Sequence, residues 1–360
     1  MADAPRLQEP RGPEELVDFG ARQARGRGRL RAKPSCDPGH DSECYCVRFS
    51  PDGKLLAASF ANGAIHIFDA AAGRQEIVLN GAPTDSAGEA PALRQPTTRL
   101  RWKPMEEGVL TSVNAEFQEQ VQHWDVKSGV CIGSITESDN NLFCLDYSSD
   151  GSCFATAGHD RTVRMYDATT QTVTRALGAD DLTETGGHSN RIFSLKFHPA
   201  EPSVVLSGGW DRTVRVWDSR SGRSERTLWD CYVCGDSVDV SSDGKRVLTG
   251  SKQVKNALQI WDFGTGKVSE TVQWATADSP STSLLLAAQF SKDLDSGMIL
   301  AGGSEENEAR FYDCPEGQPA FAFAALVGVP RPVFSVDFSA AGRVAAAGGA
   351  DGRVRLMEVL

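Results

Sequence analysis

The sequence lacks long apolar runs. Among its 360 residues the longest such run, residues 320–329, is about half the length that a helix needs to cross a bilayer. No charged and then apolar leader opens the chain, and early acids argue against a transit peptide; they are Asp3, Glu9, Glu14, Glu15 and Asp18. Glycosylation acceptors of the Asn-x-Ser/Thr type are absent too. We therefore expect an intracellular protein without a membrane span.

Motifs that carry catalysis are also missing. The sequence has no Gly-x-Ser-x-Gly nucleophile turn, no phosphate-binding Gly-x-x-x-x-Gly-Lys-Ser/Thr loop and no His-Glu-x-x-His zinc helix. A cluster of Asp293, Asp295 and Gly297 lacks the later bidentate acid of a calcium loop. The six histidines are scattered. We therefore expect no enzyme activity, and no catalytic, cofactor-binding or metal-binding residues.

Positive charge is in deficit, since the formal net charge at pH 7 is −11. An acidic molecule is a poor match for nucleic-acid phosphates, so nucleic acid is disfavoured as a partner. One local exception is a basic run near the N-terminus: Arg25, Arg27, Arg29, Arg31 and Lys33. It can contact an anionic partner such as RNA, an acidic tail or a membrane surface. We favour the simpler interpretation that it decorates the solvent side of an edge strand.

What the sequence does contain is one pattern repeated seven times. The clearest copy is residues 192–222, IFSLKFHPAEPSVVLSGGWDRTVRVWDSRSG. Its period-two alternation predicts strand, turn, strand, tight turn and strand, and helix-period spacing is absent. The third strand of each copy ends in an apolar or aromatic residue followed by an acid: Phe68-Asp69, Trp124-Asp125, Tyr166-Asp167, Trp217-Asp218, Trp261-Asp262, Tyr312-Asp313 and Met357-Glu358.

Successive acids in this series lie 42 to 56 residues apart. This is close to the roughly 40 to 45 residues of one four-stranded propeller blade, and the longer intervals indicate loop insertions. An internal repeat makes one large domain rather than the two that length alone suggests. Apolar residues make up 40% of the chain, enough for cores between stacked sheets. We predict an all-β, seven-bladed β-propeller of four-stranded antiparallel blades.

These residues resemble the WD-repeat family over nearly all of the chain after residue 40. Gly39-His40 and Gly187-His188 match the Gly-His that precedes a blade's innermost strand in that family. The Asp of its tight turn is matched in four repeats by Asn62, Asp160, Asp211 and Asp351. Repeats two, five and six have Gln118, Lys255 and Glu306 there, so we expect looser blades. The resemblance implies a hydrogen-bonded structural network in repeat four: His188, Ser207, Asp211 and Trp217.

The resemblance also implies how the ring closes, because each repeat of the family begins with the outermost strand of the preceding blade. The sequence reaches Leu360 at the end of a third strand, so blade seven lacks an outer strand unless the N-terminal part supplies it. We predict that residues 27–33 do so, which removes open sheet edges. Residues 1–24 are predicted to be a flexible tail, and residues 25–360 the propeller domain.

Nine cysteines, an odd number, lie mostly in or beside predicted strands. We interpret them as reduced thiols in the cytosol or nucleus. Cys231 and Cys234 form a Cys-x-x-Cys pair that fits half a zinc site or a redox pair, but no second pair follows at suitable spacing. Cys44 and Cys46 are expected to share one strand face. For all four we favour packing over chemistry.

Binding surfaces remain, and repeat architectures present broad ones. In WD-repeat proteins the face with the turns between second and third strands is the commonest docking surface. The residues at or beside these turns form the candidate protein-binding set: Trp210, Arg212, Arg191, His159, Arg161 and Phe117. Because Trp and Arg dominate measured interface hot spots, Trp210 is either an interface anchor or a cover over the blade core.

One stretch is more specific. Residues 205–220, VLSGGWDRTVRVWDSR, resemble at every defined position the sixteen-residue box of WD-repeat substrate receptors in cullin-4 ubiquitin ligases. The resemblance implies that its terminal Trp-Asp-x-Arg, with Asp218 and Arg220, docks on the ligase adaptor, where Arg can present a planar fork of donors. Most of the box is also regular blade sequence, so Arg220 carries most of the information.

Three functions remain open. The leading hypothesis is a non-catalytic scaffold that assembles a multiprotein complex through its propeller faces and is monomeric within it. The first alternative is a substrate receptor of a cullin-4-type E3 ubiquitin ligase, with a cullin adaptor as partner. The second alternative is a chromatin or RNA-associated reader that uses the channel mouth and the basic run. We expect a cytoplasmic location, with nuclear, ciliary or centriolar locations as alternatives.

Overall fold

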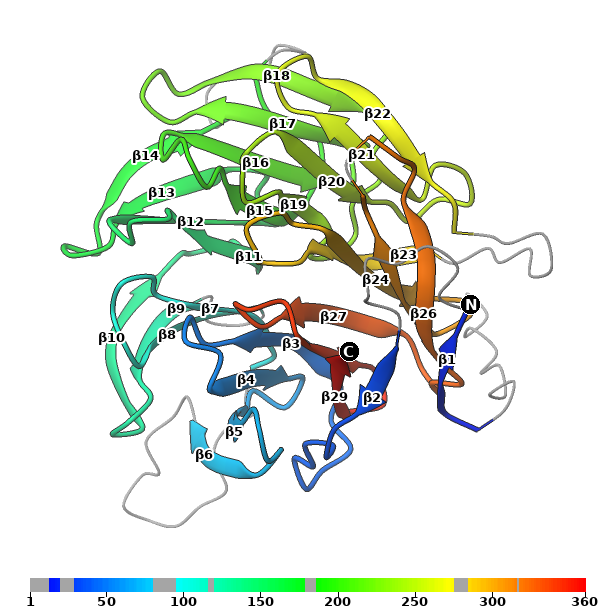
Figure 1. Cartoon of the computed structure of the whole chain (residues 1–360). Helices are drawn as coiled ribbons and strands as arrows, with labels where there is room; N and C mark the ends of the chain where they lie inside the picture. Colours follow the sequence, from blue (N-terminus) through cyan, green and yellow to red (C-terminus); the bar gives the residue numbers. More distant parts are fainter. Residues whose placement is uncertain are drawn as a thin grey trace, which may run out of the picture.

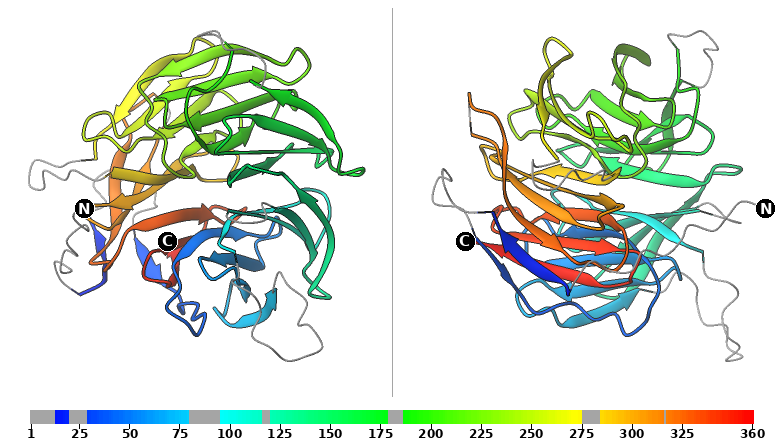
Figure 2. Two further views of the ribbon diagram at one scale, coloured as in Figure 1. Left: turned by 180° about the vertical axis from the view of Figure 1, so that it is seen from behind. Right: turned by 90° about the vertical axis from the view of Figure 1, so that its right-hand side faces the viewer.

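The computed structural model describes residues 13–19, 29–79, 95–115, 120–178, 186–274, 284–315 and 317–360. Within these residues it contains 29 strands and no helix. The strands form seven antiparallel sheets around a common centre (Figures 1 and 2), and the first strands of neighbouring sheets contact one another. The predicted all-β, seven-bladed β-propeller is confirmed, with each sheet as one blade and its first strand innermost.

The first four blades follow one another along the chain. Blade 1 has β3 (Cys44–Phe49), β4 (Leu55–Phe60), β5 (Ile65–Asp69) and β6 (Gln75–Leu79). Blade 2 has β7 (Thr97–Trp102), β8 (Val109–Asn114), β9 (Gln120–Asp125) and β10 (Val130–Thr136). Blade 3 has β11 (Leu142–Tyr147), β12 (Cys153–Gly158), β13 (Val163–Asp167) and β14 (Val173–Leu177). Blade 4 has β15 (Ile192–Phe197), β16 (Val204–Gly209), β17 (Thr213–Asp218) and β18 (Arg223–Trp229).

Two of the last three blades also take a strand from the start of the chain. Blade 5 has β19 (Val238–Val240), β20 (Arg246–Gly250), β21 (Leu258–Asp262) and β22 (Lys267–Val272). Blade 6 has β23 (Leu284–Phe290), β24 (Met298–Ser304), β25 (Ala309–Asp313) and β26 (Phe321–Val327), with β1 (Glu15–Asp18) outermost. Blade 7 has β27 (Val333–Phe338), β28 (Val344–Gly349) and β29 (Val354–Val359), with β2 (Leu30–Ala32) outermost.

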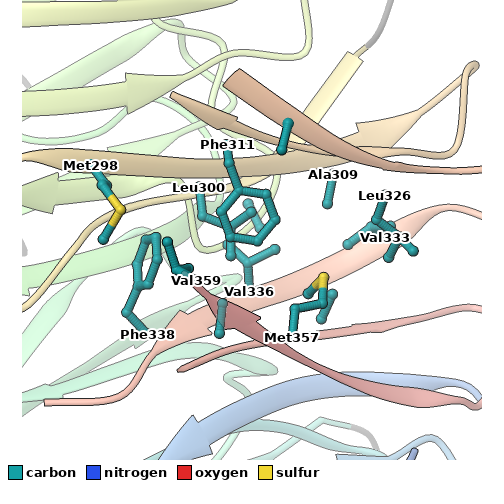
Figure 3. Close-up of a cluster of buried hydrophobic side chains, with 14 of the residues drawn as sticks. Met298, Leu300, Ala309, Phe311, Leu326, Val333, Val336, Phe338, Met357 and Val359 are labelled. Atoms are coloured by element: carbon teal, nitrogen blue, oxygen red, sulfur yellow. The ribbon is translucent and has the colours of Figure 1, made fainter. Parts of the chain in front are cut away.

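The core lies between blades. Successive strand residues point to opposite faces of a sheet, so each blade presents apolar side chains to both neighbours. Figure 3 shows the cluster between blades 6 and 7, where Phe311 and Phe338 meet edge to face with ring centroids 6.1 Å apart. Each fully buried side chain of this size contributes roughly 1.5–3 kcal/mol. The apolar alternation in the sequence therefore becomes a series of cores around the ring.

Strand β2 closes the ring as predicted for residues 27–33. It pairs with β29 through Leu30 and Val359, and the backbone N–H of Lys33 donates to Leu356 at 2.9 Å. Arg31 of the basic run lies on this edge strand and forms an ion pair with Glu358. The run is thus used in part by the closing strand, although Arg25 and Arg27 lie outside the described residues.

The flexible tail predicted for residues 1–24 does not hold for β1. Glu15–Asp18 pair with β26 as a fifth strand of blade 6, and Glu14 accepts two hydrogen bonds of 2.7 Å from Arg355 in blade 7. A Cβ on Gly328 would lie 2.4 Å from the carbonyl oxygen of Pro13, so this close approach requires glycine. The low apolar content of residues 1–24 gave no sign of this strand, which is ordered by its pairing with β26, far away in the sequence.

Bulges interrupt the innermost strands of six blades near their start, at the second residue in five blades and at the third in blade 6. In blade 1 the bulge lies at Tyr45, and it sends the two flanking cysteines to opposite faces. Cys44 packs against blade 7, whereas Cys46 packs against Leu100 of blade 2. The expectation that Cys44 and Cys46 share a face is wrong, because a bulge shifts the alternation by one residue.

Three aspartates join neighbouring blades around the channel. Each forms an ion pair with a cation of the preceding blade: Arg101–Asp146 at 2.9 Å, Lys196–Asp239 at 2.9 Å and Lys292–Asp337 at 2.6 Å. Each also accepts a backbone N–H from the following blade: Phe197 to Asp146 at 2.8 Å, Phe290 to Asp239 at 2.9 Å and Phe49 to Asp337 at 2.7 Å. These bonds connect six of the seven junctions, and the Trp102 indole connects blades 1 and 2 through the carbonyl of Arg48, at 3.0 Å.

Removing residues 1–33 should open the ring, because β29 then becomes an exposed edge. A backbone hydrogen bond contributes about 1 kcal/mol net, so we expect the free energy of unfolding to fall by roughly 3 kcal/mol. Urea unfolding followed by circular dichroism measures this loss. The control is a chain without residues 1–24, which loses β1 but keeps β2. An equal loss of stability in both truncations would show that β2 does not close the ring.

Candidate functional site at the channel mouth

The bulges gather one side chain from each of six blades at one end of the channel. They are Tyr45, Thr98, Phe143, Phe193, Leu286 and Phe334, and all six line one cavity of about 350 Å³. Its remaining lining residues are Pro96, Arg99, Ala115, Cys234 and Gly235. Bulges re-aim side chains and are frequent beside functional sites. We call this cavity the mouth pocket, and the end of the ring where the innermost strands begin the entry face.

A continuous aromatic stack forms one wall of the mouth pocket. Phe143 and Phe193 stack with ring centroids 4.7 Å apart and planes 8° from parallel. Trp210 stacks on Phe193 at 4.8 Å, and the Arg191 guanidinium lies 5.5 Å from the Trp210 ring centroid. Trp210 is half-buried, so it both covers Phe193 and leaves part of its ring accessible at the surface.

Arg99 lies at the base of the mouth pocket and is 6% exposed. It donates to three backbone carbonyls from three blades: to Phe143 at 3.1 Å, to Phe193 at 3.4 Å and to Tyr45 at 3.5 Å. Burial lowers the pKa of Arg99 to about 10, and the nearby cations Arg48 and Arg101 act in the same direction. The side chain therefore remains charged at neutral pH.

The channel is closed beneath Arg99. Asp236 of blade 5, which is 2% exposed, reaches across to the opposite side of the ring. It forms an ion pair with Arg48 of blade 1 and another with Arg101 of blade 2, the latter at 3.0 Å. Because these pairs cross the centre, the mouth pocket is a blind cavity and not the end of an open pore.

The four residues of the structural network meet in blade 4. His188 joins Asp211 through Nδ1 at 2.8 Å and Ser207 through Nε2 at 2.7 Å, and the Trp217 indole donates to Ser207 at 2.7 Å. Burial alone would raise the pKa of Asp211, but hydrogen bonds from His188, Thr213 and Ser189 outweigh it and lower the pKa. The network fixes the turn that presents Trp210.

The other entry-face candidates lie on two neighbouring blades. Arg161 and His159 are exposed at the β12–β13 turn of blade 3, and Arg212 at the β16–β17 turn of blade 4. Arg161 and Arg212 have φ of 70° and 62°, whereas Gly63 and Gly352 hold the same turn position in blades 1 and 7. A left-handed backbone costs a non-glycine residue roughly 1 kcal/mol. Arg212 is paired with Asp230, and Phe117 lies outside the described residues.

Asp218 and Arg220 lie at the other end of β17, on the opposite face of the ring. We call this the exit face. Asp218 accepts a hydrogen bond from the backbone N–H of Arg220 at 2.9 Å and one from its Nε at 3.2 Å. Asp69, Asp167 and Asp262 cap the matching turns of their blades in the same way. Asp218 is therefore part of ordinary turn chemistry, and the 78% exposed Arg220 side chain is what distinguishes this turn.

Sequence reasoning missed most of the mouth pocket. Five of the six bulge residues are apolar or aromatic, and four of these stand second in their strands, a regularity that comparison of the seven copies would reveal. Arg99 had a signal as well, since β7 is an innermost strand with two arginines, Arg99 and Arg101. The sequences of the copies do not reveal the bulge that turns these side chains toward the channel.

The Cys-x-x-Cys pair borders the pocket. Cys231 is buried and Cys234 half-buried, both as free thiols, and burial raises their pKa to about 12 and about 11. Thiols with raised pKa are poor nucleophiles at neutral pH. In the part of the chain that the structure describes, no group of three or more His, Cys, Asp or Glu side chains could hold a metal ion. No helix among these residues has the length and apolar character to cross a membrane.

Comparison with known proteins agrees with this architecture. The family model for the WD domain, G-beta repeat, matches residues 33–69, 129–167, 180–218 and 326–357. Four segments of this seven-bladed propeller are WD40 repeats. The matched segments fall on blades 1, 3, 4 and 7. The turn positions of the other three repeats, Gln118, Lys255 and Glu306, lie outside them, although β10 of blade 2 falls within residues 129–167.

Curated relatives of the WD40 propeller are distant. Protein tipD of Dictyostelium discoideum is 23% identical over 268 residues, which are 64% of this chain and 41% of tipD. Autophagy-related protein 16 of Arabidopsis thaliana is 26% identical over 177 residues, 49% of this chain and 32% of that protein. Target of rapamycin complex subunit LST8 of Mus musculus is 26% identical over 152 residues, 42% and 44%. The chain thus spans less than half the length of each of these relatives.

Replacing His188 by alanine should destabilise the WD40 propeller. The change leaves Asp211 and Ser207 buried without their shared partner, which costs about 2–3 kcal/mol of unfolding free energy. Urea unfolding measures the difference. The matched control is His159→Ala, which removes an exposed histidine from the same face and should change stability by less than about 0.5 kcal/mol. Equally small losses in both variants would show that the network does not stabilise the blade.

Proposed function

We propose that this WD40 propeller is a non-catalytic scaffold that holds a multiprotein complex together through the faces of its ring. The observation that carries the proposal is the entry face. There a half-buried Trp210, with Arg191 over its ring, stacks on Phe193 of an apolar cavity, and the turns of blades 3 and 4 carry exposed arginines. Interfaces are anchored by such Trp and Arg side chains beside pockets.

Backbone strain supports the same assignment. Arg161 and Arg212 adopt the left-handed conformation at turn positions that glycine fills in two other blades. Arg212 offsets part of this strain through its ion pair with Asp230, whereas the described residues show no ion pair for Arg161. A binding role for Arg161 accounts for arginine at that turn, which faces outward on the entry face.

The names of relatives are consistent with work inside assemblies. LST8 is named as a subunit of the target of rapamycin complex, and a relative from Gallus gallus, 26% identical over 239 residues, is named U3 small nucleolar RNA-associated protein 15 homolog. For this chain we propose protein partners and a cytoplasmic location. All nine cysteines are free thiols, as expected in a reducing compartment.

Trp210→Ala should remove partners that dock on the entry face. Truncating an aromatic anchor typically costs an interface 2 kcal/mol or more, about thirtyfold in affinity. Quantitative affinity purification of the tagged protein from its native cells, with folding checked by thermal melt, measures the loss. The control is Trp229→Ala, which removes a 64% exposed tryptophan from the outer strand of the same blade. Recovery of no stable partner by the wild-type protein would contradict the scaffold.

A second candidate, the substrate receptor of a cullin-4-type ligase, rests on the exit face. Arg220 extends from the turn after β17 with its side chain 78% exposed, and its guanidinium stays within 3.2 Å of Asp218. Such a fork is available to the acid or carbonyl groups of an adaptor. The cap made by Asp218 holds the turn in place whichever function applies.

Arg220→Glu tests this candidate. Reversing an exposed charge should leave folding unchanged, but it should abolish enrichment of a cullin adaptor in the same purification because the fork is lost. The control is Arg223→Glu, the same change at an exposed position three residues along the chain. If no adaptor is recovered by the wild-type protein, or if Arg220→Glu still recovers one, the box is blade sequence alone.

A further inference from the structure

Arg99 differs from the other cations around the channel. Arg48 and Arg101 are paired with Asp236, Lys196 with Asp239 and Lys292 with Asp337. Among the described residues no carboxylate forms an ion pair with Arg99, whose hydrogen bonds go to three backbone carbonyls. Charged groups this deeply buried are normally paired, because desolvation is costly. One buried positive charge at the base of the cavity therefore has no carboxylate partner among the described residues.

The hydrogen-bonding capacity of Arg99 is also incomplete. A guanidinium has five N–H donors in a fixed fork, and three of them are accounted for by Phe143, Phe193 and Tyr45. Two of those bonds are long, at 3.4 and 3.5 Å. The remaining donors belong to a side chain that lines the mouth pocket. A carboxylate entering the pocket can accept from them, and charge-assisted bonds of this kind are stronger than bonds to neutral carbonyls.

The walls above Arg99 narrow the choice of ligand. Apart from Arg99 and the Thr98 and Tyr45 hydroxyls, the cavity is lined by apolar and aromatic side chains, a thiol and backbone. Its volume of about 350 Å³ lies at the lower end of the range for small-ligand pockets, roughly 300–1,000 Å³. A carboxylate on a short apolar stem fits both the base and the walls.

We propose that the mouth pocket binds an Asp or Glu side chain of an extended partner segment, with the carboxylate on Arg99 and apolar neighbours against Phe143 and Phe193. This names the partner chemistry of the proposed scaffold and rests on that function. Arg191 lies over Trp210, which stacks on Phe193 of this wall, so further positive charge lies beside the aromatic stack. The net charge of −11 opposes the approach at long range, but physiological salt screens it beyond about 8 Å.

Selection from a random displayed hexapeptide library on the full-length protein tests the proposal even though the natural partner is unidentified. Asp or Glu should be enriched at one fixed position with apolar or aromatic neighbours. In the best selected peptide, replacing that acid by its amide should lower affinity roughly tenfold in the wild-type protein, as expected for a charged hydrogen bond. The same replacement should have almost no effect on Arg99→Gln. Arg353→Gln, which removes an exposed arginine of blade 7, is the control and should retain the tenfold difference.

Enriched peptides without a fixed acid, or an equal cost of the acid-to-amide change in Arg99→Gln, would overturn the proposal. If Arg99→Gln does not fold, competition on the wild-type protein decides: 3-phenylpropanoate should displace the peptide at lower concentration than 3-phenylpropanamide, and equal displacement would overturn the proposal. Failure of the pocket proposal can be distinguished from failure of the scaffold proposal. If peptides with a fixed acid are selected but no native complex is recovered, the pocket proposal stands and the scaffold proposal fails. If a native complex is recovered but no acid is selected, the scaffold proposal stands and the pocket proposal fails.

Discussion

The structure depends on the buried aspartates that bridge the blades. A propeller has no covalent link between its last blade and its first, and the apolar core of each blade packs only against its two neighbours. Asp146, Asp239 and Asp337 each hold a cation of the preceding blade and a backbone N–H of the following one. Burying such charges is tolerated only because every carboxylate has more than one donor. The closing strand β2 also joins the start of the chain to the last blade, because it pairs with the outer edge of β29.

The candidate binding site lies where the pairing of buried charges between blades stops. A bulge near the start of an innermost strand shifts the alternation of its side chains by one residue. In β7 the fifth residue, Arg101, therefore joins the ion pairs between blades. The second and third positions place Thr98 and Arg99 at the mouth. Among the described residues, Arg48, Arg101, Lys196 and Lys292 pair with buried carboxylates around the channel, and Arg99 of the same region is available to a ligand. Because Arg99 lies within this network, the surrounding bonds hold the residues of the site in fixed positions.

How much could be predicted follows from how local each signal is. The repeat and the strand order depend on alternation and on turn residues within one copy, which the sequence contains, whereas the closing strand followed from the resemblance to the WD-repeat family. Strand β1 depends on the edge of β26, some 300 residues away, and ELVD is too short to show a pattern. The bulges depend on hydrogen-bond register between strands, so Cys44 and Cys46 were placed on one face. The pocket was missed for that same reason, since Phe143 and Phe193 look like ordinary core residues until the bulge turns them.

The same bridges bear on how such a scaffold works. Coupling between two binding sites needs an element with two arrangements that both sites bias. Among the described residues, β17 runs between the turn that presents Trp210 and the turn that presents Arg220, and it is paired on both sides with β16 and β18. The ion pairs of Asp236 cross the channel. Displacing either would leave buried polar groups unpaired, at a cost of several kcal/mol. Partners on the two faces are therefore expected to bind independently, and what the ring adds is their high effective concentration relative to each other.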